Sequence, residues 1–168
     1  PDGSVSIDPL NLSEDVKNSI ENEFILVYTG LTRSASSVLK KQKEMTSSRF
    51  QELTALRHQA FEVRSALEQH HLDLAAHFLE ESWQIKRTLV DGITGENLDQ
   101  LHDLIMDSGA TGAKLLGAGG GGFFLVHAPG EYTRRRLNER LKPENRILPL
   151  LIDEQGSTII YDDGKRWG

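Results

Sequence analysis

The sequence contains no cysteine, which excludes disulfide bonds and thiolate metal sites. Aromatic residues make up 7% of the 168 residues, and no uninterrupted apolar run approaches the roughly 18 residues of a membrane span. Basic residues are also few: 19 Lys and Arg against 25 Asp and Glu give a net charge of -6, which argues against a broad nucleic-acid-binding surface. The N-terminus lacks the basic and apolar regions of a signal peptide. These absences predict a protein of the reducing cytoplasm that binds neither membrane nor nucleic acid.

The beginning of the chain predicts a boundary between two structural units. The first residue is Pro1, and SVSIDPL (residues 4–10) alternates apolar and polar positions as a strand does. A strand at a chain end needs a partner strand, so we expect it to belong to an upstream lobe. Ser13 is a suitable N-cap for a short linker helix over 14–23. Residues 1–23 are therefore predicted to end an upstream lobe, and residues 24–168 to form one domain.

Apolar periodicity predicts the elements of that domain. FILVYTG (24–30) is an apolar run closed by glycine and indicates a buried strand. Helical spacing of apolar residues follows over about 35–108, with Trp83 in one apolar stripe. AKLLGAG and GFFLVHA indicate two strands, a helix covers about 130–141, and RILPLLID and STIIYDD indicate a hairpin that turns at Gln155 and Gly156. This order predicts an α+β fold: a ferredoxin-like split βαβ antiparallel sheet with a large helical insertion.

The segment between those two middle strands is the most unusual in the chain. Gly117, Gly119, Gly120, Gly121 and Gly122 place five glycines in six positions, with Ala118 between them. A hairpin turn needs only one or two positive φ angles, so a hairpin alone does not account for five. Side-chain-free backbone can instead direct several N–H groups at one anion. A flexible hairpin, or a close contact within the sheet, remains the alternative.

Two segments resemble a known family. GAKLLGAGGGGFFLV is similar to the third signature motif of the GHMP superfamily of small-molecule kinases, which includes galactokinase, homoserine kinase and mevalonate kinase. That motif lies in the C-terminal half of those enzymes, just after a helix, as LIMDSGATGAKLL indicates here. Within the superfamily, VYTGLTRSASSVLKKQ (27–42) most resembles the sugar kinases that act on D-glycero-D-manno-heptose 7-phosphate, with fucokinases nearby. The resemblance covers nearly the entire chain.

The resemblance implies an activity and indicates that the catalytic residues lie in the other half of the enzyme. Such enzymes transfer the γ-phosphoryl group of ATP to the anomeric hydroxyl of the sugar, with ATP and Mg²⁺ bound by the complete enzyme. The family's ATP phosphate loop and catalytic aspartate lie in the N-terminal half, and this sequence contains no equivalent. We therefore expect a C-terminal half that lacks catalytic and metal-binding residues, is inactive alone, holds neither cofactor by itself, and works with an N-terminal kinase lobe on a sugar phosphate.

The resemblance also implies which residues of this chain bind ligand. We expect Gly117, Ala118, Gly119, Gly120, Gly121 and Gly122 to contact nucleotide phosphates through backbone N–H groups. GLTRSASS (30–37) superficially resembles the family's second motif, but Thr32 and Arg33 replace the expected Gly-Ser. We interpret it as a strand-to-helix turn whose Thr32, Arg33 and Ser34 face a substrate phosphate, because a guanidinium and a helix N-terminus both favour phosphate. Lys114 either adds positive charge to this site or points to solvent.

Other functions stay open at this stage. A fucose, galactose or mevalonate type of GHMP kinase would keep the phosphoryl chemistry and change the acceptor. A noncatalytic ligand-binding module could also use a ferredoxin-like scaffold, because fold alone does not determine activity. The six histidines are spread over several elements, which argues against a histidine metal site. The basic run from Arg134 to Arg146 is typical of a solvated helix face.

Overall fold

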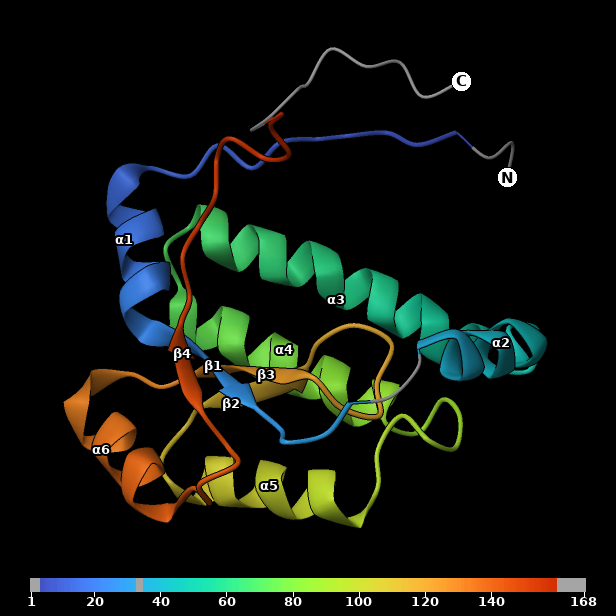
Figure 1. Ribbon diagram of the computed structural model, residues 1–168. Helices are drawn as coiled ribbons and strands as arrows, with labels where there is room; N and C mark the ends of the chain where they lie inside the picture. The colour runs from blue at the N-terminus through green and yellow to red at the C-terminus, as the bar shows by residue number, and fades with distance from the viewer. Residues whose placement is uncertain (1–3, 33–34, 160–168) are drawn as a thin grey trace.

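The structure is a computed structural model, and it describes residues 4–32 and 35–159. Six helices and four strands occur in these residues (Figure 1). The helices are α1 (Glu14–Glu23), α2 (Ala35–Met45), α3 (Phe50–Glu68), α4 (Leu72–Lys86), α5 (Glu96–Asp107) and α6 (Gly130–Arg140). The strands are β1 (Phe24–Tyr28), β2 (Gly112–Leu115), β3 (Phe123–His127) and β4 (Ile147–Pro149). None of these helices is both long enough and apolar enough to cross a membrane.

The four strands form one antiparallel sheet in the order β2-β3-β1-β4. β1 pairs with β3 so that Val27 lies opposite Phe124, and β2 pairs with β3 so that Leu115 lies opposite the same Phe124. Helices α2 to α5 form a long insertion between β1 and β2. This confirms the predicted fold class, an α+β domain with an antiparallel sheet and a large helical insertion.

Strand alternation determines which side chains build the main core. Because neighbouring residues of a strand point to opposite faces, Val27, Phe124 and Leu115 share one face, and all three are fully buried. Trp83 of α4 packs edge-on against Phe124, with ring centroids 5.6 Å apart. Ile105 of α5 belongs to the same buried cluster. The sheet is therefore held against helices on this face by contacts far apart in the sequence.

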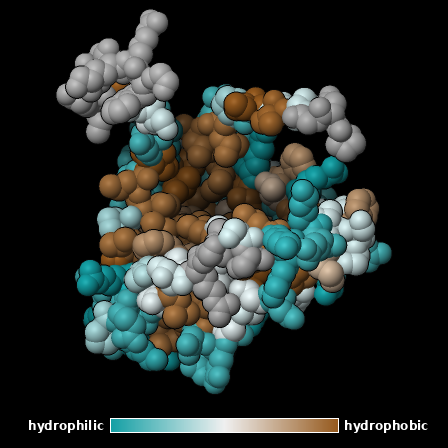
Figure 2. Space-filling model, turned by 45° about the vertical axis from the view of Figure 1, so that its right-hand side comes forward, coloured by the Kyte–Doolittle hydropathy of each residue, from teal (hydrophilic) through white to brown (hydrophobic). Residues whose placement is uncertain are grey.

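The opposite face of the sheet is less completely covered. Phe24 packs there with Leu72 and Ala76 of α4 in a second, smaller buried cluster. Farther along, Tyr28 and Phe123 are half-buried, with ring centroids 5.2 Å apart. Figure 2 shows hydrophobic side chains gathered in the hollowed centre of one face of the molecule, with hydrophilic side chains along its lower rim.

Helix α1 begins and ends where the sequence predicts. Ser13 is its N-cap, and the Ser13 hydroxyl accepts a hydrogen bond from the Val16 N–H at 3.4 Å. Glu14 and Asp15 lie in the first turn, where negative charge favours the helix dipole.

The cap gives a modest test of this local prediction. Ser13→Ala removes the acceptor, so we expect the free energy of unfolding to fall by about 1 kcal/mol, measured by urea denaturation. Ser47→Ala changes an exposed serine between α2 and α3 and should leave it unchanged. Equal effects of the two substitutions would contradict a capping role for Ser13.

The two ends of the chain differ from the prediction. Residues 4–13 contain no strand, and Val5 and Ile7 are 87% and 85% exposed. An extended segment becomes a strand only when it pairs with another, and no described residue pairs with this one. At the other end, Asp153 Oδ1 accepts hydrogen bonds from the N–H groups of Gln155 and Gly156, so a turn forms as predicted. The described residues after β4 form no hairpin, and much of its predicted second arm lies outside the described residues.

Candidate functional site

The glycine loop, residues 116–122, connects β2 to β3 at one end of the sheet (Figure 1). At the same end β1 finishes and leads into Thr29–Leu31, because Tyr28 lies opposite Phe123. β4 begins there as well, after the segment 141–146. Antiparallel pairing therefore brings two other connecting segments to the end of the sheet where the loop lies.

Close backbone packing explains why glycine recurs in this loop. All five glycines have positive φ angles, from 69° at Gly117 to 152° at Gly121. A Cβ added to Gly121 would lie 2.5 Å from the Leu31 carbonyl oxygen, and one added to Gly119 would lie 2.9 Å from the Ile93 Cα. Backbone atoms cannot move aside cheaply, so a side chain at Gly119 or Gly121 would displace a neighbouring segment.

Two of the loop's N–H groups are used within the protein. Gly120 donates to the Ile93 carbonyl at 2.8 Å, and Gly122 donates to the Leu31 carbonyl at 2.9 Å. These bonds hold the loop against the segment after β1 and against the turn before α5. The N–H groups of Gly117, Ala118, Gly119 and Gly121 make no hydrogen bond to described residues. Of the six positions expected to bind phosphate through the backbone, these four have donors that a ligand could use.

Two adjoining hollows lie beside the loop. The smaller, 280 Å³, is lined by Gly120, Thr32, Leu31 and residues 94–98 at the start of α5. The larger, 320 Å³, shares Leu31 and Asn97 with it. Hydroxyl, amide and charged side chains line this larger hollow: Thr29, Asn97, Gln100, Lys142, Glu144 and Asn145. Such a lining can hydrogen-bond a ligand rich in hydroxyl groups.

The other expected ligand-binding residues lie at different places. Thr32 is exposed and lines the smaller hollow, next to Gly120. Arg33 and Ser34 lie outside the described residues. Lys114 is on β2 and lines neither hollow. The structure thus brings Thr32 to the glycine loop and places Lys114 at the strand that enters it.

A lysine that the sequence analysis missed lies at the entry of the loop. Lys86, the last residue of α4, donates hydrogen bonds to the carbonyl oxygens of Leu115, at 3.3 Å, and of Gly117. Burial, and secondarily the charge of Lys114, lowers the pKa of Lys86 to about 8. Burial also lowers the pKa of Lys114. No sequence signal marked Lys86, because its partners are 29 and 31 positions away.

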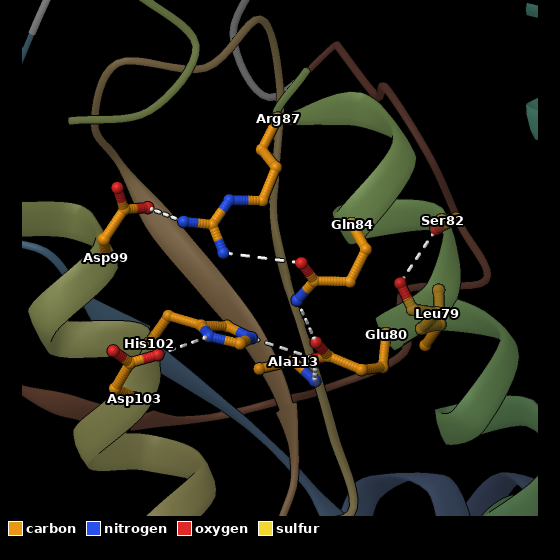
Figure 3. A network of polar contacts seen from close by, with 9 residues as sticks. All are labelled: Leu79, Glu80, Ser82, Gln84, Arg87, Asp99, His102, Asp103 and Ala113. Atoms are coloured by element: carbon orange, nitrogen blue, oxygen red, sulfur yellow. Dashed lines mark hydrogen bonds and ion pairs between the residues drawn. The ribbon is translucent and has the colours of Figure 1, made fainter. Parts of the chain in front are cut away.

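A polar network links α4, α5 and β2 behind the loop (Figure 3). His102 Nε2 lies 3.0 Å from Glu80 Oε2, and the same oxygen accepts the Ala113 N–H at 3.0 Å. Burial alone would raise the pKa of Glu80, but hydrogen bonds from His102 and Gln84 hold it below its ordinary value. Beside this pair, Arg87, which caps the C-terminus of α4, contacts Asp99 of α5. The network fixes the start of α5 relative to the strand that carries the loop.

Carboxylate and histidine side chains do not gather into a metal site. Among residues 4–32 and 35–159 there is no group of three or more that could hold a metal ion.

Comparison with curated proteins gives relatives among sugar kinases. The chain is 27% identical over 133 residues to D-glycero-alpha-D-manno-heptose 7-phosphate kinase of Campylobacter jejuni, which covers 77% of this chain and 39% of that protein. It is 30% identical over 141 residues to the bifunctional fucokinase/GDP-fucose pyrophosphorylase of Arabidopsis thaliana, covering 80% of this chain and 13% of that protein. The chain thus spans well under half of the length of these relatives.

Solved structures show the same fold. Mevalonate kinase of L. major, in complex with R-mevalonate, matches with a TM-score of 0.64 at 22% identity, over 76% of this chain and 41% of that chain. A D-glycero-D-manno-heptose 1-phosphate kinase from Bacteroides thetaiotaomicron matches with a TM-score of 0.57 at 14% identity, over 86% of this chain and 37% of that chain.

The family model confirms the resemblance first given by the glycine-rich motif. The C-terminal domain model of the GHMP kinases matches residues 63–144, which include the polar network and the whole glycine loop. Residues 63–144 of this chain therefore match the C-terminal domain of the GHMP kinases.

Proposed function

We propose that this chain is the C-terminal domain of an ATP-dependent sugar kinase that phosphorylates D-glycero-D-manno-heptose 7-phosphate at its anomeric hydroxyl. The observation that carries the proposal is the glycine loop: four of its N–H groups make no hydrogen bond to described residues, and its Gly120 lines the smaller of two adjoining hollows. The heptose acceptor is favoured by the relatedness to the Campylobacter jejuni enzyme. A cytoplasmic location belongs to the same proposal, because ATP is the phosphoryl donor.

In this proposal the chain contributes binding and positioning. The N–H groups of Gly117, Ala118, Gly119 and Gly121 donate to phosphate oxygens, and they need little reorganisation because the loop is held by the bonds of Gly120 and Gly122. Thr32, which lines the smaller hollow, contacts the sugar substrate, and the family resemblance extends this role to Arg33 and Ser34. The nucleotide phosphate loop, the catalytic aspartate and the Mg²⁺ ligands come from an N-terminal lobe, so the chain alone is inactive.

A second acceptor is favoured by a specific observation. The chain is 30% identical to a fucokinase and 26% identical over 147 residues to the L-fucokinase/L-fucose-1-P guanylyltransferase of Bacteroides fragilis. Both acceptors are sugars, and the amide and hydroxyl lining of the larger hollow suits either. Fucose lacks a phosphate group and D-glycero-D-manno-heptose 7-phosphate carries one, so an assay with both acceptors distinguishes the two candidate functions.

An assay of the whole protein tests the proposal. We expect ATP-dependent turnover with D-glycero-D-manno-heptose 7-phosphate at a kcat/KM at least about tenfold higher than with fucose, galactose or mevalonate. Higher turnover of fucose would replace the acceptor and keep the reaction. Absence of phosphoryl transfer to every acceptor, together with tight binding of one of them, would instead support a noncatalytic ligand-binding module.

A further inference from the structure

Two half-buried lysines lie at the entry of the glycine loop, and neither forms an ion pair with a described residue. Lys86 comes from the last turn of α4, and Lys114 comes from β2. Two of the three N–H bonds of the Lys86 ammonium point to the carbonyl oxygens of Leu115 and Gly117, and the third has no acceptor among the described residues. The Lys114 side chain makes no hydrogen bond or ion pair with any residue in 4–32 or 35–159.

The surroundings of these ammonium groups leave their charge uncompensated. The glycine loop has no titratable side chain, and Glu80 of α4, which contacts β2, is bound to His102 and the Ala113 N–H. Arg87, next to Lys86, is paired with Asp99 on α5. Lys114 is the charged group that acts on Lys86, and the two repel. Half-buried cations without an anion are costly, so a bound anion would relieve both the burial and the repulsion.

We propose that Lys86 and Lys114 together bind a phosphoryl group at the entry of the glycine loop. Lys86 would use its remaining N–H bond and Lys114 its free ammonium, while Lys86 keeps the loop entry in place through Leu115 and Gly117. The inference rests on the proposed function, because the phosphoryl group is that of ATP or of the phosphorylated sugar. The two sources share the same chemistry and are separated by the kinetics described below.

Binding of inorganic pyrophosphate to the whole protein tests this site without requiring turnover. We expect Lys86→Gln and Lys114→Gln each to weaken pyrophosphate binding about tenfold in isothermal titration calorimetry, because each removes one charged hydrogen bond. Lys43→Gln, on the exposed last turn of α2, should bind as the unmodified protein does. Unchanged affinity in Lys114→Gln would overturn the proposal and leave Lys86 as a support of the loop alone.

The pH dependence distinguishes a ligand contact from a supporting role. Sulfate keeps its charge between about pH 6 and about pH 9, so changes in its affinity report on the protein. Lys86 is protonated below its pKa of about 8 and neutral above it, so sulfate binding should weaken as the pH rises through about 8. Lys86→Arg, which stays charged, should retain binding above that pH. Equal pH dependence of the two proteins would contradict a direct contact. Lys86→Arg and Lys114→Gln also keep the test decisive if Lys86→Gln fails to fold.

Steady-state kinetics identify the source of the phosphoryl group. A rise in KM for ATP alone in Lys114→Gln assigns the site to the nucleotide, and a rise in KM for the sugar phosphate alone assigns it to the acceptor. No change in either KM would overturn the proposal. If the protein phosphorylates no acceptor but still binds pyrophosphate through the two lysines, the proposed function is contradicted. The proposal of an anion-binding site is then still supported.

Discussion

Gly121→Ala is expected to lower the free energy of unfolding by about 3 kcal/mol. The new Cβ would lie 2.5 Å from the Leu31 carbonyl oxygen, which accepts the Gly122 N–H, and the φ of 152° is one that residues with a side chain rarely adopt. The methyl group would therefore separate the loop from the segment after β1. Urea denaturation measures the loss.

Gly117→Ala is the matched control in the same loop. Its φ is also positive, at 69°, but nothing lies within 4 Å of the added Cβ. We expect this substitution to cost about 1 kcal/mol, from the left-handed conformation alone. Equal losses at the two positions would mean that backbone strain, rather than contact with Leu31, requires glycine at Gly121.

Glu80→Ala is expected to lower the free energy of unfolding by about 2 kcal/mol at pH 7. It leaves the Ala113 N–H and His102 without their shared acceptor, and the side chain of His102 is only 5% exposed. Urea denaturation again gives the measurement. Glu62→Ala removes an exposed partner of His58 at 3.6 Å and should change stability by less than about 0.5 kcal/mol.

The effect of Glu80→Ala should depend on pH in a defined direction. The pKa of Glu80 is below its ordinary value of 4.5 in the folded protein, so the folded state favours the carboxylate. Its contribution is fully present above about pH 4.5 and is lost as the pH falls through the lower folded pKa. The stability difference between the unmodified protein and Glu80→Ala should therefore narrow in acid. A difference that stays constant down to about pH 3 would show that the charge of Glu80 contributes nothing.

Local patterns in the sequence predicted much of the fold. The apolar runs around Val27 and Phe124 identified buried strands, and both residues are fully buried in the main core. Ser13 identified the start of α1 because a cap hydroxyl acts within one helical turn. Residues 4–10 form no strand among the described residues, because an alternating segment remains exposed coil when no strand pairs with it; their pairing with an upstream lobe stays a prediction.

The candidate site, like the fold, was only partly predictable from the sequence. The sequence by itself determined the glycine loop and the family, because a run of glycines is visible without knowing what surrounds it. Only the tertiary structure decided which loop amides are already bonded, that Lys86 meets Lys114 at the loop entry, and that His102 shares Glu80 with β2. Those contacts join residues that lie more than 20 positions apart. The geometry of these contacts depends on how α4 and α5 pack against the sheet. Periodicity in the sequence reflects only local structure, so it cannot predict this packing.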